Sequence, residues 1–247
     1  LLAESIKFDG SLILQISGTQ PVSMLVVQAS SDGAIRGLAN WEGEIAETAT
    51  FEELFKSADG SHGTMVISVE PNAKLGERYQ SLVTLEGKSL ADCFTQYFAQ
   101  SEQLKTRLWL AVDDNFASGL MLQSLPLEDT TIQSEGWNHA TILADTQRNI
   151  ELLELDAQEL LHRLYHEEDL RIYDSKSIRF ECSCSLEKIE NTVRSIGIEE
   201  ANSIIAEQGT IRVDCDFCNT QYELDSVDVT RLFSDADVTD LPGTGSV

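Results

Sequence analysis

The chain has 247 residues, 42% of them hydrophobic, and a formal net charge of -25 at pH 7. Such a chain can bury one core of ordinary size and a small second one, so two domains are expected. The negative charge repels phosphate backbones and anionic lipid, which argues against nucleic acid and membrane surfaces as partners. No apolar run reaches the roughly 20 residues of a spanning helix, and no signal-peptide pattern is present.

Alternating apolar residues dominate residues 1–127 and predict strands joined by glycine-containing turns such as Asp32-Gly33. One helix is predicted among them, over Ser89 to Glu102, with Ser89 as its N-cap and Cys93 on its apolar stripe. These residues are expected to form an α+β core of mixed sheet and helix. The predicted strands are Leu12 to Ile16, Val22 to Gln28, Ala34 to Trp41, Thr64 to Glu70, Gln80 to Glu86, Arg107 to Val112 and Gly119 to Leu125.

Residues 128–176 are predicted to form a helical linker. The polar stretch 128–139 breaks the strand pattern, and two helices are expected after it. The second begins at Asp156, where Glu159 completes a capping box. An acidic group at 167–169 follows, which makes the segment marginal as a free-standing structure. The linker should therefore be metastable and depend on its neighbours.

Four of the five cysteines lie in two tight pairs, Cys182 with Cys184 and Cys215 with Cys218. Two short pairs brought together by the fold offer four thiolates, the ligand set of a closed structural zinc site. Thiolates are also the groups that peroxide or hypochlorite attacks first, and oxidation removes the ligands and with them the metal. The sequence therefore predicts a zinc clamp in residues 177–238 that oxidants can open.

Helices are predicted between the cysteine pairs, from Ser185 to Ile196 and from Ile198 to Gln208, each ended by a glycine. A short strand should deliver the first pair, and a strand on each side should frame the second. This region has few large apolar side chains and many acids, so it is expected to lack a real core and to rely on zinc as its staple. The tail, 239–247, is expected to be flexible.

Other reactive residues favour structural roles. Cys93 is predicted to be a buried structural thiol. His162 and His166 are four residues apart but have no third ligand in view, so a solvated helix face is favoured over a metal pair. The acids at 167–169 are expected to serve solvation. No nucleophile elbow and no phosphate-binding loop is present, so we expect no catalytic residues and no enzyme.

The sequence resembles the family of redox-regulated holdase chaperones, the thirty-three-kilodalton bacterial heat-shock proteins, over nearly its whole length. The resemblance includes the C-x-C and C-x-x-C pairs. Its other stretches are Lys7-Phe8-Asp9-Gly10, Arg36-Gly37, Gly43-Glu44-Ile45, Gly76-Glu77-Arg78-Tyr79-Gln80, Tyr97-Phe98, Ser101-Glu102-Gln103-Leu104 and Arg163-Leu164-Tyr165-His166-Glu167-Glu168.

The resemblance implies that the reduced protein binds zinc through Cys182, Cys184, Cys215 and Cys218 and is inactive. It implies that oxidation joins Cys182 to Cys184 and Cys215 to Cys218 and releases zinc. It further implies unfolded or oxidatively damaged clients, homodimers on activation and transfer of clients to an ATP-dependent chaperone. Loss of the zinc should unfold the cysteine domain and expose apolar surface on the linker and the sheet.

The chain departs from the family at two places. Almost all of the helical stretch that the family has before Lys7 is missing, and residues 1–5 read like the last turn of a helix that begins upstream, as in a shortened or processed chain. Altered pairing or domain exchange is expected for such a core. Asn219 follows Cys218 where a metal knuckle often has glycine, because that residue tends to adopt positive φ.

The expectation is a cytoplasmic, ATP-independent chaperone of the oxidative stress response. The odd cysteine count fits a reducing cytosol better than a secreted disulfide scaffold. One alternative is a zinc-ribbon module that binds a protein or nucleic acid, and the net charge opposes nucleic acid. A second is a thiol-disulfide oxidoreductase, but Asp214 and Asp216 beside Cys215 would raise the thiol pKa that such an enzyme lowers.

Overall fold

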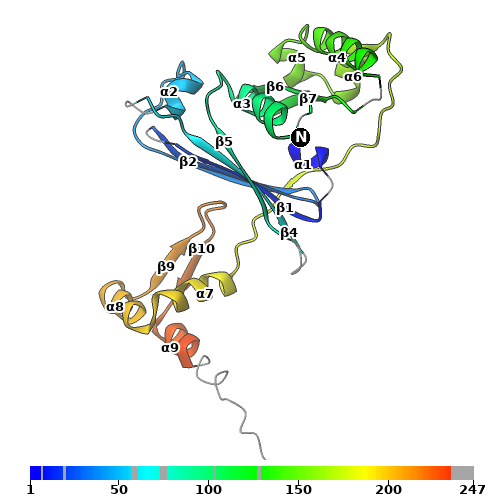
Figure 1. Cartoon of the computed structure of the whole chain (residues 1–247). Helices are drawn as coiled ribbons and strands as arrows, with labels where there is room; N and C mark the ends of the chain where they lie inside the picture. Colours follow the sequence, from blue (N-terminus) through cyan, green and yellow to red (C-terminus); the bar gives the residue numbers. More distant parts are fainter. Residues whose placement is uncertain are drawn as a thin grey trace, which may run out of the picture. The chain divides into compact units, whose positions relative to one another are not determined.

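The computed structural model describes residues 1–6, 8–18, 21–56, 60–72, 77–102, 104–126 and 129–234. The chain divides into two compact units, Leu1–Arg179 and Phe180–Val247 (Figure 1). Most of the predicted linker, 129–176, belongs to the first unit. The predicted tail, 239–247, lies outside the described residues.

An antiparallel sheet with the strand order β5-β4-β1-β2-β3-β8 forms the base of the first unit. The predicted hairpin at Asp32-Gly33 is confirmed, because β2 and β3 are antiparallel neighbours. The predicted α+β class is confirmed, because this antiparallel sheet is combined with helices that lie elsewhere in the sequence. The strands are β1 (Gly10–Ser17), β2 (Val22–Ser30), β3 (Ala34–Trp41), β4 (Thr64–Pro71), β5 (Tyr79–Thr84) and β8 (Arg179–Phe180).

One face of the sheet carries the main core. Leu12, Leu14 and Ile16 of β1 lie opposite Val69, Ile67 and Met65 of β4. Helix α3 (Leu90–Tyr97) and the π-helix η1 (Phe98–Glu102) supply aromatic residues to this core, and α2 (Phe51–Phe55) supplies Phe55. Ser89 caps α3 as predicted, because its hydroxyl accepts a hydrogen bond from the backbone N–H of Asp92 at 3.1 Å.

The part of this face formed by β2 and β3 is less covered. Val27 pairs with Leu14 and is 47% exposed, and Ile35 of β3 is 36% exposed. These side chains line a cavity of about 240 Å³, together with residues of α1 (Leu2–Ser5) and Ile178. The folded unit therefore offers apolar sheet surface that only a few residues shield.

A separate hairpin, β6 (Thr106–Val112) with β7 (Ala117–Gln123), uses both of its faces. Leu108 lies in the main core with α3, whereas Ala111 lies in a second apolar cluster with α5 and α6. The alternation of side chains along β6 thus joins the sheet to the helices. These helices are α4 (Thr130–Ala144), α5 (Asn149–Glu154) and α6 (Ala157–Tyr165).

The expectation of two helices that begin only after residue 139 is wrong. Asp129 caps α4 by accepting hydrogen bonds from the backbone N–H groups of Thr131 and Ile132. The helix therefore begins inside the polar stretch, where apolar periodicity gives no signal because most of the side chains are exposed. The capping box of Asp156 and Glu159 at the start of α6 is confirmed.

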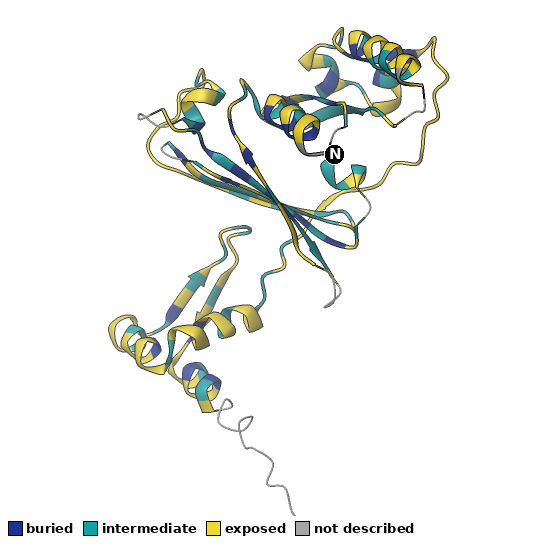
Figure 2. Cartoon of the chain, viewed as in Figure 1, coloured by how far each residue is buried: buried dark blue, intermediate teal, exposed yellow. Residues whose placement is uncertain are grey.

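Residues 169–178, which we name the strap, follow α6 without helix or strand. Figure 2 shows this segment as largely exposed. Its exposed apolar residues include Leu170, Ile172 and Ile178. With no backbone ladder of its own, the strap depends on contacts with the rest of the first unit.

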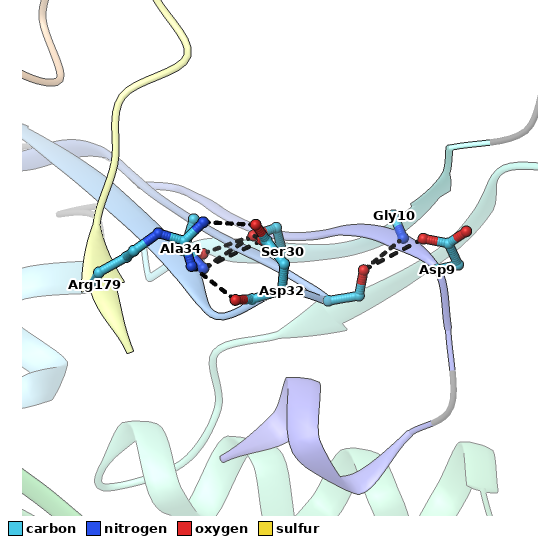
Figure 3. Close-up of polar contacts among 7 residues, drawn as sticks. Asp9, Gly10, Ser30, Asp32, Ala34 and Arg179 are labelled. Atoms are coloured by element: carbon cyan, nitrogen blue, oxygen red, sulfur yellow. Dashed lines mark hydrogen bonds and ion pairs between the residues drawn. The ribbon is translucent and has the colours of Figure 1, made fainter. Parts of the chain in front are cut away.

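Polar contacts at its C-terminal end tie the strap to the sheet. Arg179 donates hydrogen bonds to the backbone carbonyl of Asp32 at 2.8 Å and to its carboxylate at 2.6 Å, as Figure 3 shows. The backbone N–H of Arg179 also donates to the carbonyl of Gly33 at 3.0 Å. A Cβ on Gly33 would lie 2.7 Å from the carbonyl oxygen of Ser177. Glycine at this turn therefore permits the close approach of the strap.

The second unit contains the predicted helices and strands. Ser185 caps the first helix, and Gly197 and Gly209, with φ of 90° and 81°, end the two helices as predicted. The strands that frame the second cysteine pair form an antiparallel hairpin. The elements are α7 (Leu186–Ile196), α8 (Ile198–Gln208), β9 (Ile211–Asp214), β10 (Gln221–Leu224) and α9 (Ser226–Ser234).

The expectation that the cysteine region lacks a real core is wrong. Six buried residues form one cluster in this unit, and α9, which sequence reasoning missed, contributes Val229 and Leu232. Helices α7 and α8 and strands β9 and β10 supply the other four residues. The core remains small, so it supplies only part of the free energy that keeps the unit folded, and a bound metal ion can supply the rest. The cluster comprises Val193, Ala201, Ile211, Leu224, Val229 and Leu232.

Candidate metal centre

The fold of the second unit brings the four paired cysteines together. Their Sγ atoms all lie within 4.8 Å of one another. Two short separations join different pairs, since the Sγ atoms of Cys182 and Cys215 are 3.6 Å apart and those of Cys184 and Cys218 are 3.4 Å apart. Each pair thus faces the other across the cluster.

The sulfur positions fit a tetrahedral metal ion. Metal–sulfur bonds of about 2.3 Å, the length found in zinc thiolates, give a tetrahedron with edges of about 3.8 Å. The two short separations of 3.6 and 3.4 Å are close to that edge. Four soft sulfur donors favour a thiophilic ion over Mg²⁺ or Ca²⁺, which prefer oxygen. The cluster could therefore hold one metal ion with no open coordination position.

The first pair is held at the start of α7. Cys184 immediately precedes the N-cap Ser185, whose side chain accepts from the backbone N–H of Lys188 at 3.3 Å. The Lys188 ammonium reaches back to the carbonyl and the hydroxyl of Ser183, between the two cysteines. The first turn of α7 thus holds the C-x-C loop through both the backbone carbonyl and the side chain of Ser183.

The second pair lies in the turn between β9 and β10. The carbonyl of Cys215 accepts hydrogen bonds from the backbone N–H groups of Cys218 at 3.2 Å and Asn219 at 2.7 Å. Asn219 has φ of 56°, the conformation predicted for the residue after the pair. This tight turn aims both thiols of the C-x-x-C pair toward one point.

The thiols differ in their electrostatic surroundings. Hydrogen bonds with the hydroxyl and the backbone of Thr220 lower the pKa of Cys218 to about 6. The Tyr222 hydroxyl lowers the pKa of Cys184, but the neighbouring thiols outweigh it and raise that pKa to about 11. A bound cation reverses this second effect, because it favours the thiolate at every ligand. The arrangement of four adjacent thiols is therefore one that a metal ion would stabilise.

Sequence reasoning missed three residues that contact the cysteine pairs. They are Lys188, which contacts Ser183 between the first two cysteines, Thr220, which contacts Cys218, and Tyr222, whose hydroxyl donates a hydrogen bond to the Sγ of Cys184 at 3.2 Å. The strand pattern places Tyr222 on β10, but no local signal shows which sulfur it reaches. That contact depends on the packing of segments 38 residues apart.

The remaining candidates lie away from the cluster. Cys93 is fully buried in the main core, and burial raises the pKa of its thiol, so the prediction that it is buried is confirmed. His162 and His166 have ring centroids 5.9 Å apart. Among the described residues, they join no group of three or more metal ligands. Of the predicted acidic group, Glu168 pairs with His139 at 2.8 Å.

Fold and site together define a protein in which an α+β unit is followed by a small four-thiol domain of the metal-binding kind. A family model described as Hsp33 protein matches residues 1–225. The 33 kDa chaperonin of Pseudomonas fluorescens strain SBW25 is 44% identical over 243 residues, which cover 96% of this chain and 79% of that protein. The 33 kDa chaperonin of Shewanella loihica is 42% identical over 236 residues, with the same coverage of both chains.

The fold is also shared with a solved structure. The crystal structure of the 33 kDa chaperonin from Thermotoga maritima matches with a TM-score of 0.76 at 22% identity, and covers 96% of this chain and 82% of that one. The chain belongs to the Hsp33 family of chaperones. The predicted resemblance is therefore confirmed. In the described part of the chain, no helix combines the length and the apolar character needed to cross a membrane.

Proposed function

We propose that this protein is a redox-regulated, ATP-independent holdase of the cytoplasm. In the reduced state, Cys182, Cys184, Cys215 and Cys218 bind Zn²⁺ and the chaperone is inactive. On oxidation the zinc leaves, the second unit unfolds, and apolar surface becomes available to unfolding or oxidatively damaged proteins. The convergence of the four sulfur atoms is the observation that carries this proposal.

The proposed oxidation is balanced with peroxide as the oxidant. One thiolate of a pair attacks H₂O₂ and becomes a sulfenic acid, releasing hydroxide. The second thiolate attacks that sulfur, a disulfide forms, and a second hydroxide leaves. Two pairs therefore consume two peroxide molecules and release one Zn²⁺. The proposed products, inherited from the family resemblance, are the disulfides Cys182-Cys184 and Cys215-Cys218.

Disulfide mapping tests this pairing directly. Short sulfur separations also join different pairs, at 3.6 Å for Cys182 with Cys215 and 3.4 Å for Cys184 with Cys218, so cross-pair disulfides are the competing products. We expect mass spectrometry of the oxidised, proteolysed protein to find links within each pair and two peroxide molecules consumed per zinc released. Links between pairs would contradict the proposed disulfides. They would not contradict the proposal that the four reduced cysteines bind zinc.

The connection between the metal and the sheet supports the proposed coupling. Cys182 follows β8 by two residues, and Arg179 of β8 anchors the strap at the β2–β3 turn. The strap borders the partly exposed face that carries Val27 and Ile35. If the second unit unfolds, the strap loses support at its C-terminal end. The apolar residues of the strap and the sheet face that carries Val27 and Ile35 can then bind apolar segments of clients.

The proposed partners follow from the same surfaces. The net charge of -25 keeps such exposed apolar surface soluble and disfavours nucleic acid and anionic membranes. We further propose that the activated protein forms homodimers and passes its clients to an ATP-dependent chaperone, as the family resemblance implies. Four thiolate ligands would leave no open coordination position on a bound Zn²⁺, which supports a binding role without catalysis.

Client protection separates this proposal from its alternatives. The protein oxidised by peroxide at raised temperature is expected to suppress aggregation of a chemically unfolded client, whereas the reduced zinc form is expected not to. The same samples should show no catalytic reduction of insulin disulfides. Turnover by the reduced form would favour a thiol-disulfide oxidoreductase, and equal client binding in both states would favour a constitutive zinc-ribbon module.

Loss of the Arg179 anchor should loosen the strap without oxidation. Replacing Asp32 by asparagine removes the charge that pairs with Arg179 and keeps the side chain size. We expect cleavage of residues 166–178 in the reduced zinc form to accelerate about two- to fivefold, a change typical of an exposed ion pair. The same change at exposed Asp114 is the control. Cleavage at the wild-type rate in both variants would show that the anchor has no effect on the strap.

The pH dependence of this anchor has a defined sign. Hydrogen bonds from Ser30 and then Arg179 lower the pKa of Asp32 from 3.8 to about 2. Because the pKa of Asp32 is lower in the folded state than in the unfolded state, its carboxylate stabilises the folded state at a pH above the unfolded-state pKa. This contribution is lost as the pH falls through the folded-state pKa. The difference between wild type and Asp32→Asn in hydrogen exchange at the Arg179 amide should be constant from pH 5 to 8. A difference that changes within this window would contradict the assignment.

A further inference from the structure

A tyrosine hydroxyl joins the two cysteine pairs, in addition to the contacts between their sulfur atoms. The hydroxyl of Tyr222 donates to the Sγ of Cys184 at 3.2 Å, although the two residues are 38 positions apart. Tyr222 lies on β10, where its backbone pairs with Val213 of β9. The backbone of Tyr222 therefore belongs to the hairpin that carries the second cysteine pair, while its hydroxyl contacts the first pair.

This contact differs in kind from the one at Cys218. The Sγ of Cys218 lies 3.2 Å from the Oγ1 of Thr220, two residues further along the same turn. That contact shapes a single turn. The Tyr222 contact joins two separate segments, the C-x-C loop before α7 and the hairpin β9–β10. The Tyr222 contact therefore adds to the direct approach of the Cys184 and Cys218 sulfur atoms, 3.4 Å apart, in opposing the departure of Cys184 from the second pair.

We propose that Tyr222 is a positioning residue of the metal centre, which holds Cys184 beside the second pair and slows its loss from the metal. The inference rests on the proposed function, because it requires the four cysteines to bind a metal ion. A hydroxyl that donates to a thiolate spreads its charge and makes its electron pair less available for attack. It also fixes the ligand direction, as groups behind metal ligands commonly do.

The test compares three full-length variants in the reduced, zinc-loaded state. Tyr222→Phe removes only the hydroxyl that contacts Cys184. Thr220→Val removes the hydroxyl that contacts Cys218, and Tyr173→Phe removes a hydroxyl from the exposed strap. A chromogenic chelator measures zinc affinity, and N-ethylmaleimide with mass spectrometry measures the reactivity of each cysteine. In that labelling the sulfur bonds to one alkene carbon, and the neighbouring carbon takes a proton from water.

For Tyr222→Phe we expect zinc affinity to fall about 10- to 100-fold, the usual effect of losing a group behind a metal ligand. Labelling of Cys184 should accelerate more than labelling of the other three cysteines. Thr220→Val should instead accelerate Cys218, and Tyr173→Phe should match wild type. Circular dichroism at saturating zinc checks that each variant is folded.

Two results for Tyr222→Phe would overturn the inference. Wild-type affinity with wild-type labelling of Cys184 would show that the hydroxyl has no role. Equal acceleration at all four cysteines would show that the variant loosens the whole unit and does not act through Cys184. Failure of the wild-type chain to bind zinc is a separate result, because it would reject the proposed metal site before any variant is compared.

Discussion

Removal of the metal from the reduced protein is expected to unfold the second unit while the first unit stays folded. Structural zinc contributes about 10 to 16 kcal/mol of apparent binding free energy in small metal domains. Among residues 180–234, six buried apolar residues form the core of this unit. Residues 181–247 also hold fourteen acidic side chains and four basic ones, a net charge of -10 that opposes compaction. Ion pairs such as Arg212 with Glu223 and Arg231 with Asp228 compensate only part of this charge.

Hydrogen exchange can locate this loss of structure. After chelation under reducing conditions, we expect amide protection to disappear from α7, α8 and the β9–β10 hairpin. Protection in β1 and β4 of the first unit should be unchanged, which makes those strands the internal control. Restoring zinc should restore protection. If the chelated unit keeps its protection, its small core is sufficient and the proposed switch has no structural basis.

Replacing Gly10 by alanine is expected to destabilise the first unit by about 3 kcal/mol or more, through overpacking and backbone strain. Gly10 has φ of +148°, and an added Cβ would lie 2.0 Å from the carbonyl oxygen of Glu70 and 2.8 Å from the Cα of Pro71. Both are backbone atoms of β4, so no side chain can turn away. Gly10 is also held by Ser31, because its backbone N–H donates to the Ser31 hydroxyl at 3.2 Å and its carbonyl accepts from the Ser31 N–H at 3.0 Å.

Thermal unfolding of the first unit checks this effect. Gly136→Ala is the matched control, because Gly136 lies within α4 and no atom lies within 4 Å of its added Cβ. That variant should gain up to about 1 kcal/mol from helix propensity. Opposite shifts in melting temperature are therefore expected from the same chemical change. A wild-type melting temperature for Gly10→Ala would show that β4 can move away from β1.

Local patterns predicted most individual elements. Apolar alternation marked the strands, Ser89 marked the start of α3, and Gly197 and Gly209 marked the helix ends, because each signal acts within a few residues. The cysteine spacing likewise indicated that the four thiols meet. Each of these features is encoded next to the element it shapes.

Features that depend on tertiary packing were not predictable in this way. The pairing of β1 with β4 joins strands about fifty residues apart, and periodicity does not specify partners. The start of α4 depends on a cap inside a polar stretch. Helix α9 is only nine residues long, yet its Val229 and Leu232 complete a core with residues from the rest of the unit. The Tyr222 contact depends on the same assembly.

The absence of regular structure in the strap has a kinetic consequence for the proposed switch. Residues 169–178 have no helix or strand to melt, so their detachment breaks only a few separate contacts. The strap itself therefore adds no cooperative step to the proposed response, and the cooperative step is the unfolding of the second unit. On return, the strap can dock again without nucleating a helix or strand, once the thiols are reduced and the second unit has refolded around zinc.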